Sequence, residues 1–289
     1  MSWITDSISD WLKDGLVDAV MKRFEDMFAS INGQIGDIAV NVGKTPQNWN
    51  AGVFNMIRSL SETVVLPIAG MILTFVVCYE LIHMLIERNN FHDFQTFEIY
   101  KWIFKTFVAV YILTHTYDIT MGIFELAQET VNRSAGLISG SLSVTADAAL
   151  AGLEAQLQAM GVWELMGLWL ETFIVSFCLR AMSIVIFIVI FGRMIEIYLT
   201  VSIAPIPLAT MANREWGQMG NNYLKSLFAL AFQGFLIMVC VAIYAALVQN
   251  IPNTGGAQSA IWTTVGYTIL LCFTLFKTGS LSKGLFSAH

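Results

Sequence analysis

The chain is poor in charged residues. Asp, Glu, Lys and Arg make up 12% of its 289 residues, whereas 56% are hydrophobic. Soluble domains carry about 25% charged residues. This balance, together with several long apolar runs, excludes an ordinary soluble domain and predicts an all-α polytopic membrane protein. The net charge of −6 also argues against a general nucleic-acid-binding face.

Catalytic and metal-binding signatures are also absent from the sequence. It has no G-x-x-x-x-G-K-[ST] phosphate loop, no H-E-x-x-H motif and no G-x-S-x-G elbow. The four cysteines stand singly in apolar runs and the four histidines are scattered (Cys78, Cys178, Cys240, Cys272; His83, His92, His115, His289). We interpret the cysteines as buried thiols and the histidines as structural. No enzyme, cofactor or metal is therefore expected.

The longest apolar run lies near the middle of the chain. As one helix from Leu168 to Ile203 it would be roughly 54 Å long, whereas crossing a bilayer takes about 20 residues. We therefore expect one overlong helix that crosses from about Trp169 to Phe191 and continues past the membrane surface. Pro205 and Pro207 should end it, because a proline lacks an N–H and disfavours helix in the preceding residue. Residues 208–212 would then touch the membrane without crossing it.

Four other segments have the length and apolarity of crossings, which makes about five transmembrane helices. They are residues 64–86, 102–117, 226–247 and 261–276. The first 40 residues show a helical apolar period beside an acidic edge, which predicts an amphipathic helix. Gly33, Gly36, Gly43 and Pro46 are expected to loosen the segment that follows. We expect an extracellular amphipathic segment at residues 1–62, two transmembrane helices at 63–117, an extracellular helical hairpin at 118–165 and the transmembrane core at 166–289.

The distribution of basic residues predicts the orientation, because lysine and arginine are retained on the cytoplasmic side. With five crossings and the N-terminus outside, eight basic residues fall inside: Arg88, Lys101, Lys105, Arg193, Arg214, Lys225, Lys277 and Lys283. Arg58 and Arg133 fall outside near a crossing, with Lys44 at the limit. The N-terminus is therefore expected outside the cell membrane and the C-terminus inside.

Arg180, Glu80 and His83 are the candidate polar sites within the predicted crossings. An arginine at mid-membrane costs about 2.5–3.5 kcal/mol unless it is paired or hydrated. Arg180 therefore needs a partner from another helix, for which Glu80 is our prediction, and it either forms a structural pair or lines a polar path. Glu80 and His83 share one helix face and could be functional or snorkel outward. Arg193 and Glu196, three residues apart, are expected to pair at the inner surface.

The five crossings, the sizeable outer loop and the motif RMIEIYLTVSIAPIPLA, which begins at Arg193, carry a resemblance. From about Asn50 to its C-terminus, the chain resembles the TrbL-like inner-membrane channel subunits of type IV secretion systems, particularly those of Gram-positive conjugative elements. The resemblance implies an oligomeric ring in the cell membrane that contacts other secretion subunits and ATPases. It also implies a part in passing a DNA–relaxase substrate, with residues 193–207 lining or supporting the cytoplasmic entrance. It carries over no catalytic residue.

Two other functions stay open from the sequence alone. A small-molecule transporter could use the Pro205/Pro207 break as its site, although no second interrupted run occupies a matching position. A non-conducting membrane assembly factor is the other alternative. If DNA passes, we expect it to be a transient substrate moving along a mostly neutral wall, because few basic groups are available to hold it.

Overall fold

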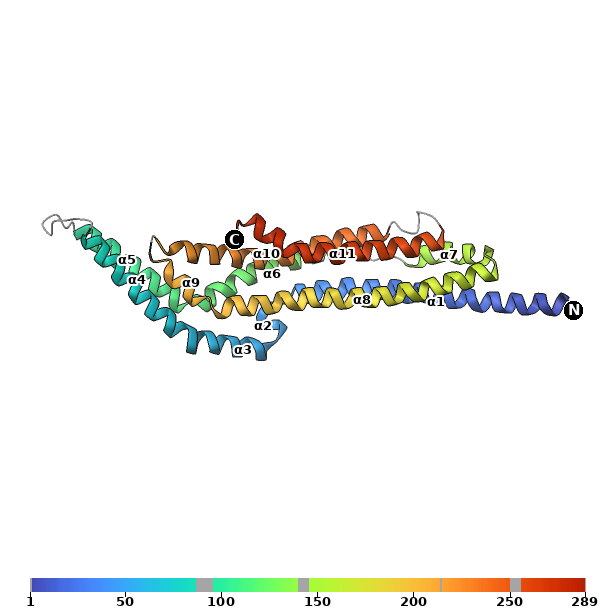
Figure 1. The fold of residues 1–289 in the computed structure, drawn as a ribbon, viewed down its shortest axis with the longest axis horizontal. Coiled ribbons are helices and arrows are strands. Elements are labelled where there is room, and N and C mark those ends of the chain that lie inside the picture. The colour runs from blue at the N-terminus through green and yellow to red at the C-terminus, as the bar shows by residue number, and fades with distance from the viewer. Residues whose placement is uncertain (1, 87–95, 140–145, 214, 250–255, 289) are drawn as a thin grey trace. The chain divides into compact units, whose positions relative to one another are not determined.

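The computed structural model describes residues 2–86, 96–139, 146–213, 215–249 and 256–288, and every regular element in them is a helix (Figure 1). The predicted all-α class is therefore confirmed. Arg88 and Arg214, which count toward the predicted orientation, lie outside the described residues. In chain order the elements are α1 (Ser2–Val42), α2 (Pro46–Trp49), α3 (Ala51–Leu60), the π-helix η1 (Ser61–Val65), α4 (Leu66–Ile86), α5 (Thr96–Thr114), α6 (Thr116–Ser139), α7 (Ala146–Ala159), α8 (Val162–Ser202), α9 (Pro205–Thr210), α10 (Gly217–Gln249) and α11 (Ala257–Leu285).

Four stretches of helix are long and apolar enough to cross a membrane. They are Ala51–Ile86, Val162–Ser202, Gly217–Gln249 and Gln258–Leu285. A fifth exists if α5 and α6, which meet at an angle of 68°, form one broken span. The predicted class of polytopic membrane protein with about five spans is thus confirmed.

Two threonines lie at the bend between α5 and α6. Thr114 donates its hydroxyl to the carbonyl of Val110 at 3.0 Å, and Thr116 donates to that of Leu113 at 2.8 Å, so both hydroxyls are satisfied within the helices. Beyond the bend α6 runs to Ser139, so it occupies much of the first arm of the hairpin predicted at residues 118–165.

The chain forms two compact units, each assembled from separated stretches. Unit 1 comprises residues 1–43, 131–190 and 235–278. Within it α1 packs against α7 and buries an apolar stripe (Val17, Val20, Phe24, Met27, Phe28, Ile31, Ile38). Of the residues predicted to loosen the chain, Gly43 and Pro46 lie where α1 ends and α2 begins, but Gly33 and Gly36 lie inside α1, which continues unbroken to Val42. Buried Ile31 and Ile38 flank the two glycines and hold this part of the helix in place.

Polar contacts join the remaining helices of unit 1. The carboxylate of Glu171 on α8 accepts hydrogen bonds from Gln258 at 2.7 Å and Trp262 at 3.2 Å, both on α11. The hydroxyls of Tyr244 on α10 and Thr268 on α11 lie 2.9 Å apart in a buried position. These bonds satisfy polar groups on apolar helices, which matters because the bilayer core supplies no water as a hydrogen-bond partner.

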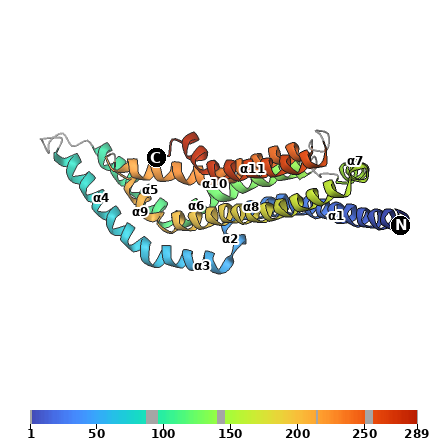
Figure 2. The ribbon, with the colours of Figure 1, turned by 45° about the vertical axis from the view of Figure 1, so that its right-hand side comes forward.

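Unit 2 comprises residues 44–130, 191–234 and 279–289. Figure 2 shows its α3, η1 and α4 as one curved helix. Thr45 and Asn50 cap α2 and α3, since their side chains accept from Asn48 N–H at 3.1 Å and Val53 N–H at 3.0 Å. Pro67, which lacks an N–H, follows the π-helical turn, and such turns mark kinks in helices. The predicted boundary at residues 62 and 63 falls inside this turn.

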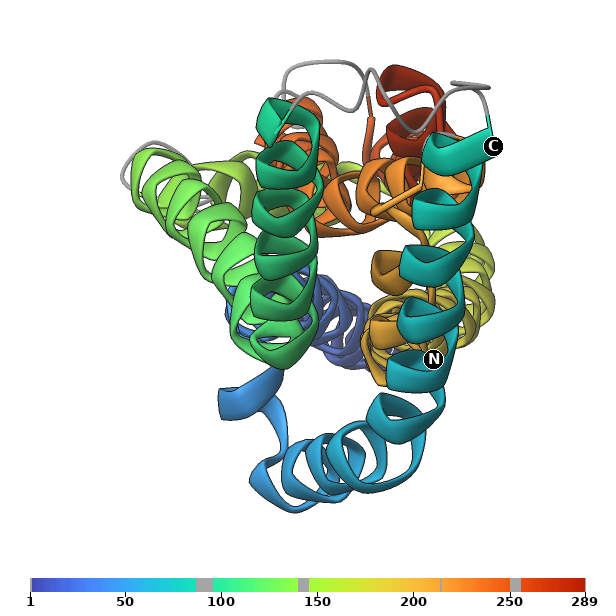
Figure 3. The ribbon, with the colours of Figure 1, turned by 90° about the vertical axis from the view of Figure 1, so that its left-hand side faces the viewer.

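The short helix α9 is buried inside unit 2. It packs against α4 and α5, which run alongside one another (Figure 3). The small residues Ala69 on α4 and Ala209 on α9 are both buried in this contact, which allows the two backbones to approach closely. Leu208, Ala209, Thr210 and Ala212 are buried in protein. The expectation that residues 208–212 touch the membrane is therefore wrong for these four positions.

Candidate functional site

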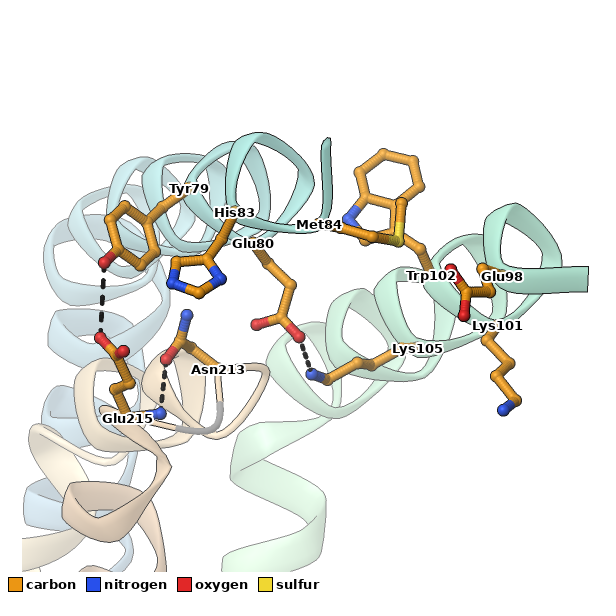
Figure 4. A pocket seen from close by; sticks show the side chains of 10 residues that line it. All are labelled: Tyr79, Glu80, His83, Met84, Glu98, Lys101, Trp102, Lys105, Asn213 and Glu215. Atoms are coloured by element: carbon orange, nitrogen blue, oxygen red, sulfur yellow. Dashed lines mark hydrogen bonds and ion pairs between the residues drawn. The ribbon is translucent and has the colours of Figure 1, made fainter. Parts of the chain in front are cut away.

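A polar pocket of about 710 Å³ opens in unit 2 between α4, α5 and the turn that follows α9 (Figure 4). We call it the polar pocket. It is lined by Tyr79, Glu80, His83, Met84, Glu98, Lys101, Trp102, Lys105, Asn213 and Glu215. Three carboxylates, two ammonium groups and a histidine thus gather at the ends of helices that are otherwise apolar. The predicted candidates Glu80 and His83 both line it.

An ion pair crosses this pocket from α4 to α5. Lys105 donates to the carboxylate of Glu80 at 2.5 Å, and both side chains are partly exposed. Glu80 is therefore occupied within its own unit, and the prediction that it pairs with Arg180 is not what the structure shows. The sequence places Glu80 and Lys105 in different helices 25 residues apart, so no helical spacing could have indicated the pair.

The pair predicts the outcome of a charge exchange. Lys105→Met should lower the free energy of unfolding by up to about 1 kcal/mol, as for partly exposed pairs, because it leaves a carboxylate alone in an apolar helix. The double exchange Glu80→Lys with Lys105→Glu should recover most of that loss. Thermal unfolding of the purified protein in detergent measures both changes. Lys101→Met, in the same pocket but lying over Phe97, is the matched control. A double variant no more stable than the single one would disprove the coupling.

Aromatic stacking fixes the turn after α9 against α4. The indole of Trp216 stacks on the rings of Phe75 and Tyr79, with centroids 5.6 and 5.7 Å apart. The side-chain oxygen of Asn213 accepts from the backbone N–H groups of Glu215 at 2.7 Å and Trp216 at 3.2 Å. This contact could not be predicted from the sequence, because the rings are about 140 residues apart and only the tertiary fold brings them together.

The predicted pair of Arg193 and Glu196 does not form. Glu196 instead accepts from Lys283 of the C-terminal segment at 3.0 Å, and both of these side chains are half exposed. Arg193 faces inward and is buried, and one of its terminal nitrogens donates to the carbonyl of Ala231 at 3.4 Å. Its Nε has no hydrogen-bond partner among the described residues. Arg193 is buried in the core whereas Glu196 is half exposed and bound to Lys283, so the expected pair is not made.

Helix α8 ends at Ser202, and α9 begins at Pro205. Pro205 and Pro207 are both buried within unit 2. On the same stretch Tyr198 donates its hydroxyl to the carbonyl of Pro46 at 2.6 Å, in a buried position. Residues 193–207 therefore support a packed core on one face, and their other face carries the exposed side chains Ile195, Leu199 and Ile203.

The contacts of Trp49 conflict with one part of the predicted topology. Its ring lies 5.3 Å from that of Phe191 and 5.9 Å from that of Tyr198, measured between centroids. Residues 46–49 were predicted outside, whereas Phe191 and Tyr198 were predicted at or beyond the inner surface. Groups in contact share one level, so the two assignments cannot both hold. Both assignments were predicted from sequence patterns along single helices, and such patterns carry no information on how the helices pack together.

Arg180 lies in unit 1, exposed on α8, and no ion pair or hydrogen bond joins it to another residue in the described parts of the chain. The same part of the chain contains no group of three or more His, Cys, Asp or Glu side chains that could hold a metal ion. The sites that the structure offers are therefore charged pockets on transmembrane helices.

These features define an all-α, multi-pass membrane protein with four or five spans. Its membrane core includes one helix of 41 residues that ends at a proline break. The chain belongs to the TrbL/VirB6 plasmid conjugal transfer like protein family, whose model matches residues 31–205. The protein is thus a membrane subunit of a conjugal transfer type IV secretion system. Comparisons with curated proteins and with solved structures found no match.

The family match and the resemblance noted in the sequence cover different parts of the chain. The match begins at residue 31, within α1, and ends at Pro205, directly after α8. The resemblance was predicted from about Asn50 to the C-terminus. The match therefore covers the last part of α1, from residue 31 to Val42, and the helices from α2 to α8, whereas α10 and α11 lie outside the matched residues.

Proposed function

We propose that this chain is a channel or scaffold subunit that oligomerises in the cell membrane and helps a DNA–protein substrate to pass. The family match over residues 31–205 carries the proposal, because it includes the overlong helix and reaches its proline break. The proposed orientation has the N-terminus outside and the C-terminus inside. Other membrane subunits and ATPases of the secretion machine are its proposed partners.

The surface of the spans supports assembly with further subunits. In α8, only 22% of the most apolar 18-residue stretch is buried within the chain, and the share is the same for the corresponding stretch of the Ala51–Ile86 span. Large side chains such as Phe177, Phe187 and Ile188 are exposed on α8. In a membrane, lipid or neighbouring copies must cover these faces. We propose that part of this surface is the contact between copies, which cross-linking of the protein in native membranes can measure.

The acidic charge of the chain supports passage of DNA rather than tight binding of it. Each phosphate contact needs a cation, and affinity for nucleic acid falls steeply with salt. The polar pocket mixes three carboxylates with two lysines, and the whole chain is acidic. A strand moving past such a surface would not be held.

A mating assay tests the proposed function. Deletion of the reading frame should reduce transfer of the element below detection, and supply of the intact gene in trans should restore it. The purified protein in lipid nanodiscs should show no measurable affinity for single-stranded DNA at physiological salt. Transfer at the normal frequency after deletion would refute a role in transfer. Tight binding of single strands by the isolated protein would refute the neutral passage.

A further inference from the structure

A second charged pocket lies within unit 1, between α1 and α8. Its volume is about 470 Å³. The side chains that matter for its chemistry are Lys22, Arg23 and Asp26 of α1 and Trp169 and Arg180 of α8. Three cations and one carboxylate give it a local charge of +2, in a chain whose net charge is −6. We call it the basic pocket.

Among the described residues, no ion pair neutralises the cations of the basic pocket. No ion pair joins Asp26 to Lys22, Arg23 or Arg180 in the described residues, although Lys22 and Arg23 stand one helical turn before it. The guanidinium of Arg23 lies over the rings of Trp169 and Phe173, 5.2 and 5.4 Å from their centroids. That contact orients Arg23 and leaves its charge in place. The pocket therefore presents unmatched positive charge.

The side chains around Arg180 form an apolar surface that can face lipid. The most apolar 18-residue stretch of α8 has a mean hydropathy of 2.6. Phe173, Phe177 and Ile184 lie at helical spacing from Arg180 on one face, and all three are exposed. A cation on such a face is costly in hydrocarbon unless an anion or water meets it. Trp169, about 16 Å along the helix from Arg180, is a residue type typical of the headgroup level.

We propose that the basic pocket binds the phosphate of an acidic phospholipid, whose acyl chains lie along the exposed face of α8. Basic residues on amphipathic helices and beside transmembrane helices attract acidic headgroups in this way. The size of the pocket matches a headgroup, and three cations on two helices match one or two phosphate charges. A DNA strand would need a longer basic track than these three cations provide. The proposal does not depend on the role in transfer.

Native mass spectrometry of the purified, delipidated full chain tests the site. In neutral detergent, the protein is titrated with phosphatidylglycerol or with phosphatidylcholine, which carries a phosphate but no net charge. We expect a clear preference for phosphatidylglycerol. One basic residue contributes about fivefold to the affinity for an acidic lipid, so Arg23→Gln with Arg180→Gln should weaken phosphatidylglycerol binding about 25-fold. Lys13→Gln, which removes a charge from α1 outside the pocket, should leave it unchanged.

The remaining outcomes each overturn the proposal. Equal binding of the two lipids by the unaltered protein does so and needs no variant to fold. Undiminished selectivity in the double variant places the lipid elsewhere. Displacement of phosphatidylglycerol by millimolar inorganic phosphate identifies a free-anion site instead. Preferential binding of a single-stranded oligonucleotide that the double variant loses identifies a contact with the transferred strand.

Discussion

Gly220→Ala is expected to lower the free energy of unfolding by about 1–3 kcal/mol, the range for overpacking a close-packed site. A Cβ at this position of α10 would lie 2.1 Å from Cγ of Met211 and 2.6 Å from the carbonyl oxygen of Pro207. The Met211 side chain can turn away. The Pro207 carbonyl cannot, because it belongs to α9, which is buried against α4 and α5. The added methyl group must therefore displace a helix.

Gly70→Ala is the matched control for this substitution. Gly70 also lies in a helix of unit 2, but a Cβ there meets no atom within 4 Å. Alanine is the better helix former by about 1 kcal/mol, so this variant should be unchanged or slightly more stable. Thermal unfolding of both proteins in the same detergent measures the difference. If Gly220→Ala unfolds at or above the wild-type temperature, the close approach of Gly220 to the Pro207 carbonyl is wrong.

Arg193→Met is expected to raise the free energy of unfolding by about 1–4 kcal/mol, as when apolar side chains replace buried ionic groups. Arg193 is buried, its Nε has no partner among the described residues, and its bond to the Ala231 carbonyl is long at 3.4 Å. Glu196, which could have neutralised it, is engaged by Lys283. Methionine fills a similar volume and needs no hydrogen bond.

A second arginine provides the comparison for Arg193. Arg58 is exposed on α3 and forms an ion pair with Glu62 at 2.8 Å. Arg58→Met should change stability by no more than about 1 kcal/mol, because exposed pairs contribute little. Guanidinium-induced or thermal unfolding of the two variants and the wild type measures both changes in stability. A marked loss of stability in Arg193→Met would show that the buried guanidinium has partners that this account lacks.

The sequence predicted well what depends on composition and local stereochemistry. Apolar runs identified the membrane spans, because crossing a bilayer requires about 20 apolar residues whatever the tertiary fold. Helix α8 ends two residues before Ala204-Pro205, and the position of such a break follows from the missing N–H of proline. The family resemblance rested on the same long helix and its proline motif, and the family match confirms it.

The partners of charged residues could not be predicted from the sequence. Helical spacing suggested that Arg193 pairs with Glu196, but packing buries the first and exposes the second. Glu80 pairs with Lys105 of another helix, and the basic pocket joins Arg180 to cations of α1 that are about 160 residues away. These choices depend on how helices rotate against each other, and sequence periodicity does not encode that rotation.

The number of spans is the point on which the proposed orientation depends. Five spans require α5 and α6 to cross together as one bent segment, and they place residues 46–49 outside. Four spans result if that pair does not cross, and residues 46–49 then lie on the same side as the C-terminus. The distribution of basic residues favours five spans. The contact of Trp49 with Tyr198 is the observation that favours four spans.

Cysteine accessibility in intact cells measures this most directly. Single cysteines replace Gln47, Gln158 and Ser287, which are exposed, in a protein whose four native cysteines are replaced by alanine. A membrane-impermeant maleimide is added before or after permeabilisation. Five spans predict that positions 47 and 158 are labelled from outside and position 287 only after permeabilisation. Labelling of position 47 only after permeabilisation, together with position 287, would contradict the arrangement proposed for this secretion subunit.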